Sequence, residues 1–115
     1  MRKIAYYFEL ARTIAKKPTS IRRQFLLGAI GIRTDGVIVG ACNIPAINKT
    51  PQCHAEYRVT KKLNYDSTVI VIRINRKGDY CNANPCHNCR RIMKQRGIKR
   101  CYYSISNKEY GVWIP

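Results

Sequence analysis

The stretch that most constrains the fold is a nine-residue run, STVIVIRIN, at positions 67–75. It is β-branched and apolar almost throughout, without the alternation of apolar and polar residues that a strand with one solvated face shows. Such a run is typical of a central strand in a sheet that is covered on both faces. It therefore favours a layered α/β fold, in which helices pack on each side of the sheet.

Patterns typical of helices and strands alternate along the rest of the 115 residues. Apolar side chains recur at helical spacing from Ile4 to Ala15, which predicts an amphipathic helix that ends before Pro18. Two apolar runs, 24–32 and 37–43, flank an Asp-Gly pair that is typical of a tight turn, so they are expected to form a β-hairpin.

Two further helices are expected, and each has recognisable capping signals. Thr50 is the expected N-cap of the first of them, with Pro51 at its first helical position. Asn84 and Pro85 are expected to have the same roles in the second, a helix of about 11 residues that Gly97 ends.

The C-terminal part of the chain predicts two more strands, over 99–106 and 110–114, with only a short turn between them. The expected order is then α-β-β-α-β-α-β-β. This order favours a three-layer α/β/α arrangement around a five-stranded mixed sheet, with the last two strands as an antiparallel hairpin. No repeat, linker or low-complexity tract divides the sequence, so residues 1–115 are expected to form a single domain.

Two short motifs contain residue types that bind a transition metal. Cys86 and Cys89, in PCHNC, are three residues apart and lie on one face at the start of a predicted helix, where the positive helix end favours thiolates. His54, in CHAE, falls in the first turn of its own predicted helix. An imidazole and two thiolates suit Zn²⁺, and three protein ligands leave open the fourth tetrahedral position, as in catalytic zinc sites.

Glu56 is two residues after His54, about 200° around a helix, yet both side chains can reach a metal ion over the helix end. A carboxylate beside a zinc-bound water can accept its proton, so Glu56 is the predicted general acid and base. The alternative is a structural zinc with a fourth protein ligand. Cys53 and His87 adjoin the expected ligands and should point away, whereas Cys81 in a loop stays open as a fourth ligand. In a structural zinc site, Glu56 would have no role.

The H-A-E motif followed by P-C-x-x-C resembles the signature of zinc deaminases, and the chain resembles the cytidine/deoxycytidylate deaminase superfamily. The resemblance extends from ACN at the end of the first hairpin through CHAE, the central strand and PCHNC to GIKRCYYS. It implies a cytidine deaminase-like fold and hydrolytic loss of ammonia, with zinc-activated water attacking C4 of cytosine or C6 of adenine. Glu56 would protonate the ring nitrogen, Asn43 would contact the sugar, and the Ala55 carbonyl would hold the amino group of the base.

Charge and the last hairpin point to different substrates. The chain has 22 Lys and Arg against 6 Asp and Glu, a formal charge of +16, which favours a nucleic acid or nucleotide partner. By the resemblance, however, a short connection between the last two strands is typical of members that act on free nucleosides. Candidates for phosphate or nucleic-acid contacts are Arg22, Arg23, Lys49, Arg90 and Arg91.

The leading prediction is zinc-dependent conversion of cytosine to uracil in a cytidine-type substrate, with a polynucleotide slightly favoured because of the charge. The alternatives are a free cytidine, deoxycytidine or (d)CMP deaminase, an adenosine deaminase on RNA, and a catalytically inactive, zinc-stabilised nucleic-acid-binding module. Small members of the superfamily often assemble, so a homodimer or homotetramer is a further expectation.

The sequence also predicts where the protein is located. It has no secretory-type apolar segment at its N-terminus and no apolar run long enough to span a membrane. A cytoplasmic protein without a membrane partner is therefore expected. A compact lone deaminase domain resembles those found in phages, and for such a protein the setting would be the host cytoplasm.

Overall fold

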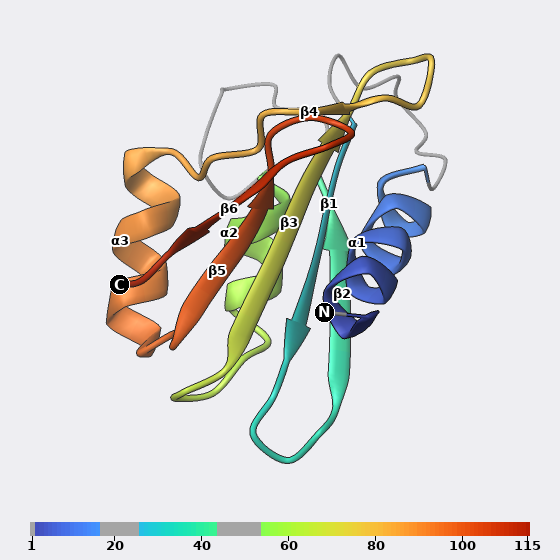
Figure 1. Ribbon diagram of the computed structural model, residues 1–115. Coiled ribbons are helices and arrows are strands. Elements are labelled where there is room, and N and C mark those ends of the chain that lie inside the picture. The colour runs from blue at the N-terminus through green and yellow to red at the C-terminus, as the bar shows by residue number, and fades with distance from the viewer. Residues whose placement is uncertain (1, 17–25, 44–53) are drawn as a thin grey trace.

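The computed structural model describes residues 2–16, 26–43 and 54–115. In chain order, its elements are α1 (Arg2–Ala15), β1 (Leu26–Ile32), β2 (Ile38–Cys42), α2 (Ala55–Thr60), β3 (Thr68–Ile74), β4 (Tyr80–Cys81), α3 (His87–Arg96), β5 (Arg100–Ser104) and β6 (Tyr110–Trp113). One sheet lies between α1 on one face and α2 with α3 on the other (Figure 1). The expected three-layer arrangement is confirmed, with one short strand, β4, in a segment that was expected to be a loop.

The strand order in the sheet is β2-β1-β3-β5-β6, and β4 pairs with β3. β3 is parallel to β5, and the other neighbours are antiparallel. The predicted central strand is therefore the centre of the sheet. Its side chains alternate between two buried clusters, since Val69 and Val71 pack toward α2 and α3, whereas Ile70, Ile72 and Ile74 pack toward α1.

Helix α1 ends at Ala15, before Pro18 as predicted, and packs directly on β1. Gly28 permits this close approach, because a Cβ atom at that position would collide with the backbone of Ala11 and Ala15. Within the part of the chain that the structure describes, no helix combines the length and apolar character needed to cross a membrane.

Both predicted hairpins are present. In the turn between β1 and β2, the Asp35 carboxylate accepts a hydrogen bond from the Val37 N–H at 3.1 Å, and Gly36 adopts a positive φ of 88° that favours glycine. The β5–β6 pair is antiparallel, with Ser104 opposite Tyr110. The five residues between these strands hold no helix, as the short connection predicted.

The helix starts differ from the predictions. Helix α3 begins at His87 with Cys86 as its N-cap, so the expected start at Asn84 and Pro85 was two residues early. The Asn84 side chain does not cap the helix, and its amide oxygen instead accepts a hydrogen bond from the Arg90 guanidinium. The predicted C-cap is confirmed, since Gly97 adopts a left-handed conformation with φ of 71°.

Helix α2 is shorter than its sequence pattern predicted. It begins at Ala55, after His54 as its N-cap, and ends at Thr60. Thr50 and Pro51, the expected cap and first helical residue, lie outside the described residues. The later helix starts matter for the site, because they place one predicted metal ligand at the N-cap of α2 and another at the N-cap of α3.

Candidate metal centre and active site

The starts of α2 and α3 meet at the end of the sheet where β2 and β3 end, which is the upper end in Figure 1. His54 and Cys86 are the two N-cap residues, and both have extended backbones, with ψ of 143° and 169°. Cys89 lies in the first turn of α3. Two helix ends, each with a partial positive charge, therefore meet at the two thiols.

The three predicted metal ligands form one cluster. The Nδ1 atom of His54 is 3.4 Å from the Sγ atom of Cys89 and 3.6 Å from that of Cys86, and the two sulfur atoms are 3.4 Å apart. Around a tetrahedral zinc ion, with bonds of about 2.3 Å to sulfur and about 2.0 Å to nitrogen, ligand atoms lie roughly 3.5–3.8 Å apart. The donor types and their spacing therefore fit Zn²⁺.

The electrostatics of the cluster also fit a cation. Cys89 is buried, and this burial, followed by the nearby Glu56 carboxylate, raises the pKa of its thiol well above the usual range. A metal dication favours the thiolate instead, because its charge offsets both effects. Cys86 is exposed, so the cluster has one open side.

No fourth protein ligand joins the cluster within the described residues. The Cys81 thiol instead contacts the Asp79 carbonyl oxygen at 3.7 Å, and His87 is exposed. Cys53 lies outside the described residues. Three protein ligands are the arrangement that leaves a position for water or substrate.

The segment that carries Cys86 is tied to the end of β5. The Ala83 N–H donates to the Ser104 carbonyl oxygen at 2.8 Å, and the Ser104 hydroxyl donates to the Cys81 carbonyl oxygen at 2.7 Å. Sequence reasoning missed this role of Ser104. No local signal could have revealed it, since the contacts join residues more than 20 positions apart.

Glu56 lies beside this cluster in the second position of α2. The side chain is only 3% exposed, and its Oε1 atom has no hydrogen-bond partner among the described residues. Burial raises the pKa of Glu56 to about 7, an effect partly offset by a hydrogen bond to its own backbone and by contact with Cys89. A carboxyl group with a pKa near neutrality can both accept and return a proton.

Asn43 and Ala55, the predicted substrate contacts, lie at the same end of the sheet. The Asn43 amide oxygen accepts a hydrogen bond from the Leu27 N–H at 3.0 Å, which holds this side chain just past the end of β2. Ala55 is fully buried and follows His54 directly. Ala55 is thus adjacent to a candidate ligand, Asn43 follows the last residue of β2, and the contacts of both residues with substrate remain predictions.

The predicted phosphate contacts are only partly within the described structure. Arg22, Arg23 and Lys49 lie outside the described residues. The Arg90 guanidinium donates to the carbonyl oxygen of Pro85 at 3.2 Å and lies 4.8 Å from the centre of the Trp113 ring. Arg90 therefore links the start of α3 to β6. Arg91 is exposed on the same helix.

A family model described as the cytidine and deoxycytidylate deaminase zinc-binding region matches residues 1–105. The chain belongs to this deaminase family. Together with the His54, Cys86 and Cys89 cluster, the match identifies Zn²⁺ as the cofactor and supports a zinc-type deaminase.

The fold of this deaminase is similar to that of a solved structure, the 1.6 Å crystal structure of cytidine deaminase from Burkholderia pseudomallei. The TM-score is 0.70, with 96% of this chain and 91% of that chain covered at 16% sequence identity. The likeness confirms the predicted cytidine deaminase-like fold. A comparison with curated proteins finds no match.

Proposed function

We propose that the protein hydrolytically deaminates cytosine to uracil in a cytidine-type substrate. The observation that carries this proposal is the three-donor cluster of His54, Cys86 and Cys89 beside the buried Glu56, one oxygen of which has no partner among the described residues. A purely structural zinc site needs no such carboxylate, because a buried carboxyl oxygen without a partner is costly.

In this proposal, His54, Cys86 and Cys89 hold the metal and Glu56 moves the protons. When bound, zinc acts as a Lewis acid that lowers the pKa of a water molecule and so supplies a nucleophile near neutral pH. Glu56 would accept a proton from the attacking water and deliver it to N3 of the cytosine ring as the water oxygen bonds to C4. It would then take the remaining proton of the new C4 hydroxyl group and pass it to the amine, so that the C4–N bond breaks and water and cytosine give uracil and ammonia.

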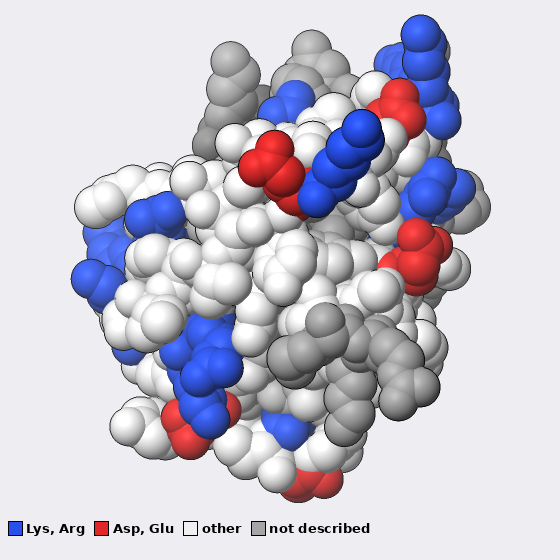
Figure 2. Space-filling model, in the orientation of Figure 1, with Lys and Arg blue, Asp and Glu red and all other residues white. Residues whose placement is uncertain are grey.

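We propose a single-stranded polynucleotide as the favoured substrate. The formal charge of +16 supports a polyanion, and Arg91, Lys94 and Arg96 are exposed on the helix that carries the two thiols. Figure 2 shows basic side chains over the α3 edge of the molecule, with other basic groups separated from them. The target base has to be unstacked, because C4 is inaccessible within a duplex.

A second candidate is deamination of free cytidine, deoxycytidine or their monophosphates. The antiparallel β5–β6 hairpin favours it, since this arrangement is the one that the resemblance associates with nucleoside-type members. The similar structure from Burkholderia pseudomallei is also named a cytidine deaminase. The same hairpin argues against adenosine deamination on RNA.

The test measures ammonia and uracil release by the zinc-loaded protein. Cytidine, deoxycytidine, their monophosphates and single-stranded RNA and DNA would be compared, with Glu56→Gln as the inactive control and the exposed Asp66→Asn as the matched active control. Turnover of an oligonucleotide that is lost in Glu56→Gln supports the leading proposal, and turnover of mononucleosides alone supports the second candidate. No turnover, with oligonucleotide binding intact, would overturn both and indicate a zinc-stabilised binding module.

A further inference from the structure

Arg90 joins the two parts of the chain that carry the thiols of the metal cluster. It follows Cys89 directly, and its backbone N–H donates to the Cys86 carbonyl oxygen at 2.9 Å. Its guanidinium turns back toward the residues that precede Cys86. There it donates to the carbonyl oxygen of the buried Pro85 at 3.2 Å and to the amide oxygen of Asn84. The same residue is therefore adjacent to one thiol residue and holds the two residues that lead into the other.

The segment before Cys86 depends on such contacts for its position. Residues 82–86 lie between β4 and α3 and have no regular secondary structure. Ser104 of β5 binds the first part of this segment through the Ala83 N–H, and the Arg90 guanidinium binds its last part. A metal ligand on an irregular segment keeps its geometry only if neighbouring groups fix that segment.

The guanidinium is itself held by the only tryptophan of the chain. Its central carbon lies 4.8 Å from the centre of the Trp113 ring. Trp113 is half-buried and packs against the buried cluster that contains Cys89, on the α2 and α3 side of the sheet. A planar guanidinium can stack on a ring with its face while its edge donates hydrogen bonds, which a lysine ammonium group cannot do. The edge strand β6 is thus connected through Arg90 to the segment that carries a metal ligand.

We propose that Arg90 is a positioning residue of the metal centre. Supported by Trp113, it holds the segment before Cys86 so that the sulfur atoms of Cys86 and Cys89 lie 3.4 Å apart, and it thereby reduces the reordering that metal binding requires. Two of its N–H donors and one face of the guanidinium are used within the protein. This role replaces the phosphate contact that was predicted for Arg90. The inference does not depend on the proposed substrate, since it concerns metal binding.

The first measurement is the zinc affinity of Arg90→Gln, by competition with a chromophoric chelator. We expect zinc to bind about 10–100-fold more weakly than to the unmodified protein. Arg90→Lys should recover little of this loss, because an ammonium group cannot stack on the ring and bind Pro85 together. Arg12→Gln is the matched control. Its guanidinium is also half-buried and lies 5.5 Å from a ring centre, that of Tyr80, but it belongs to α1 on the other face of the sheet, so zinc affinity should not change.

Cobalt and fluorescence spectra distinguish positioning from a loss of stability. Arg90→Gln saturated with Co²⁺ should show altered thiolate-to-cobalt absorption bands, because the two sulfur atoms are no longer held in the same geometry. The fluorescence of Trp113 should change when the unmodified protein binds zinc, and Arg90→Gln should lose most of this change. Thermal unfolding of the metal-free variants checks that the fold is intact.

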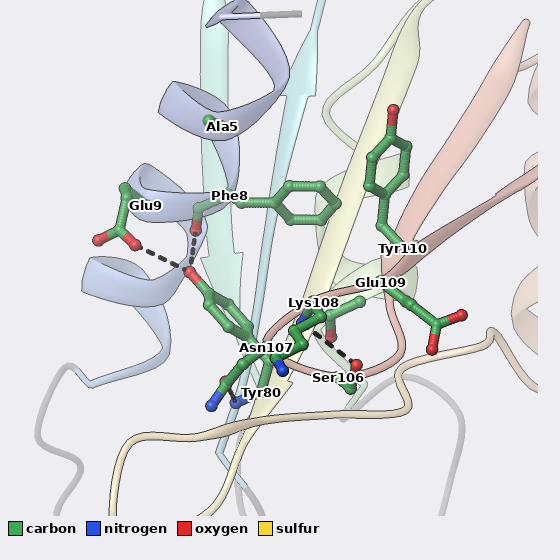
Figure 3. A pocket seen from close by; sticks show the side chains of 10 residues that line it. Ala5, Phe8, Glu9, Tyr80, Ser106, Asn107, Lys108, Glu109 and Tyr110 are labelled. Atoms are coloured by element: carbon green, nitrogen blue, oxygen red, sulfur yellow. Dashed lines mark hydrogen bonds between the residues drawn. The ribbon is translucent and has the colours of Figure 1, made fainter.

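Variants of β6 test the other end of the link. Trp113→Leu removes the ring and leaves Arg90 in place, so it tests the proposal even if Arg90→Gln fails to fold. It should weaken zinc binding by about two- to fivefold. Tyr110→Leu is its control, because Tyr110 lies on the opposite face of the same strand, where its ring centre is 5.5 Å from that of Phe8 (Figure 3). This variant should bind zinc as the unmodified protein does.

Three results would overturn the proposal. Unchanged zinc affinity in Arg90→Gln, or in Trp113→Leu where the first variant does not fold, would show that the link does not position the ligands. An equal loss of affinity in Arg12→Gln would indicate a general effect of charge or stability. Weaker oligonucleotide binding by Arg90→Gln with unchanged zinc affinity would make Arg90 a phosphate contact instead.

Discussion

The Glu56 side chain lies in an environment that is unusual for a carboxylate. It is buried, one of its oxygens has no partner among the described residues, and its pKa is raised to about 7 because burial disfavours the charged form. A neighbouring lysine or arginine would have removed this destabilisation by holding the carboxylate ionised. Without a metal ion, burial alone brings Glu56 close to the point at which it gains or loses a proton at neutral pH, and the charge of a bound Zn²⁺ lowers this pKa.

Replacing Glu56 with glutamine should separate catalysis from structure. The amide has nearly the same shape but cannot transfer the proton, so turnover should fall by at least about 10²–10⁴-fold. Zinc content, measured by metal analysis, should stay at that of the unmodified protein because Glu56 is not a ligand. Turnover close to that of the unmodified enzyme would exclude Glu56 as the general acid and base.

The proposed set of zinc ligands can be tested by measuring the zinc content of protein variants. Cys86→Ala should lose most of the metal, since one of three ligands is removed, whereas Cys81→Ala should retain it, because the Cys81 thiol contacts the Asp79 carbonyl instead. Metal analysis after dialysis against a weak chelator measures both. Zinc loss from Cys81→Ala would make Cys81 a fourth ligand and the centre structural.

At the level of elements, the contact between α1 and β1 depends on the small size of Gly28. A Cβ atom there would collide with the backbone of Ala11 and Ala15, which cannot move away without shifting the helix. Gly28→Ala should therefore reduce the free energy of unfolding by about 2–4 kcal/mol.

A matched glycine provides the control for this effect. Gly36 has a φ of 88° but nothing within 4 Å of an added Cβ, so Gly36→Ala should cost only about 1 kcal/mol of backbone strain. Urea unfolding measures both changes. Equal losses for the two variants would show that Gly28 does not serve to bring α1 and β1 together.

Zinc should hold the starts of α2 and α3 together. Helix α2 has only six residues, far fewer than an isolated helix needs for stability, and its N-cap His54 is a proposed zinc ligand. Removal of zinc should therefore raise amide hydrogen exchange over 55–60 and 87–90 more than in β1 and β3, whose stability comes from the sheet. Uniform changes along the chain would contradict a local role for the metal.

At the scale of the whole molecule, the formal charge of +16 is the property that most affects partners. Binding of single-stranded oligonucleotides should weaken steeply with salt, by about 0.7 units of log K per unit of log salt for each phosphate contacted. Replacing the exposed Arg91 and Lys94 with serine should make this slope shallower. The decrease should equal the contribution of about one to two phosphate contacts. Arg33→Ser, in the β1–β2 turn at the end of the sheet opposite the metal cluster, should not change the slope. An unchanged slope in the α3 variant would place the polyanion elsewhere.

Much of the fold was predictable because its signals are local. The central strand, both hairpins, the left-handed Gly97 and the end of α1 follow from periodicity and turn residues that occur within a few positions of each other. The three candidate metal ligands, which the structure brings together, were predicted from their residue types and short spacings. Such signals are determined by backbone geometry and side-chain chemistry alone, so they can be read from the amino-acid order.

Tertiary structure decided what depends on contacts between distant parts of the chain. The start of α3 at His87 instead of Pro85, the position of Arg90 over Trp113 and the role of Ser104 all come from such contacts. The burial of Glu56, and hence its raised pKa, exists only because several elements exclude water from the same point. The sequence by itself therefore determined the fold class and the candidate groups for the chemistry, and packing decided the environment of those groups, because desolvation is a property of the folded molecule and not of any local segment.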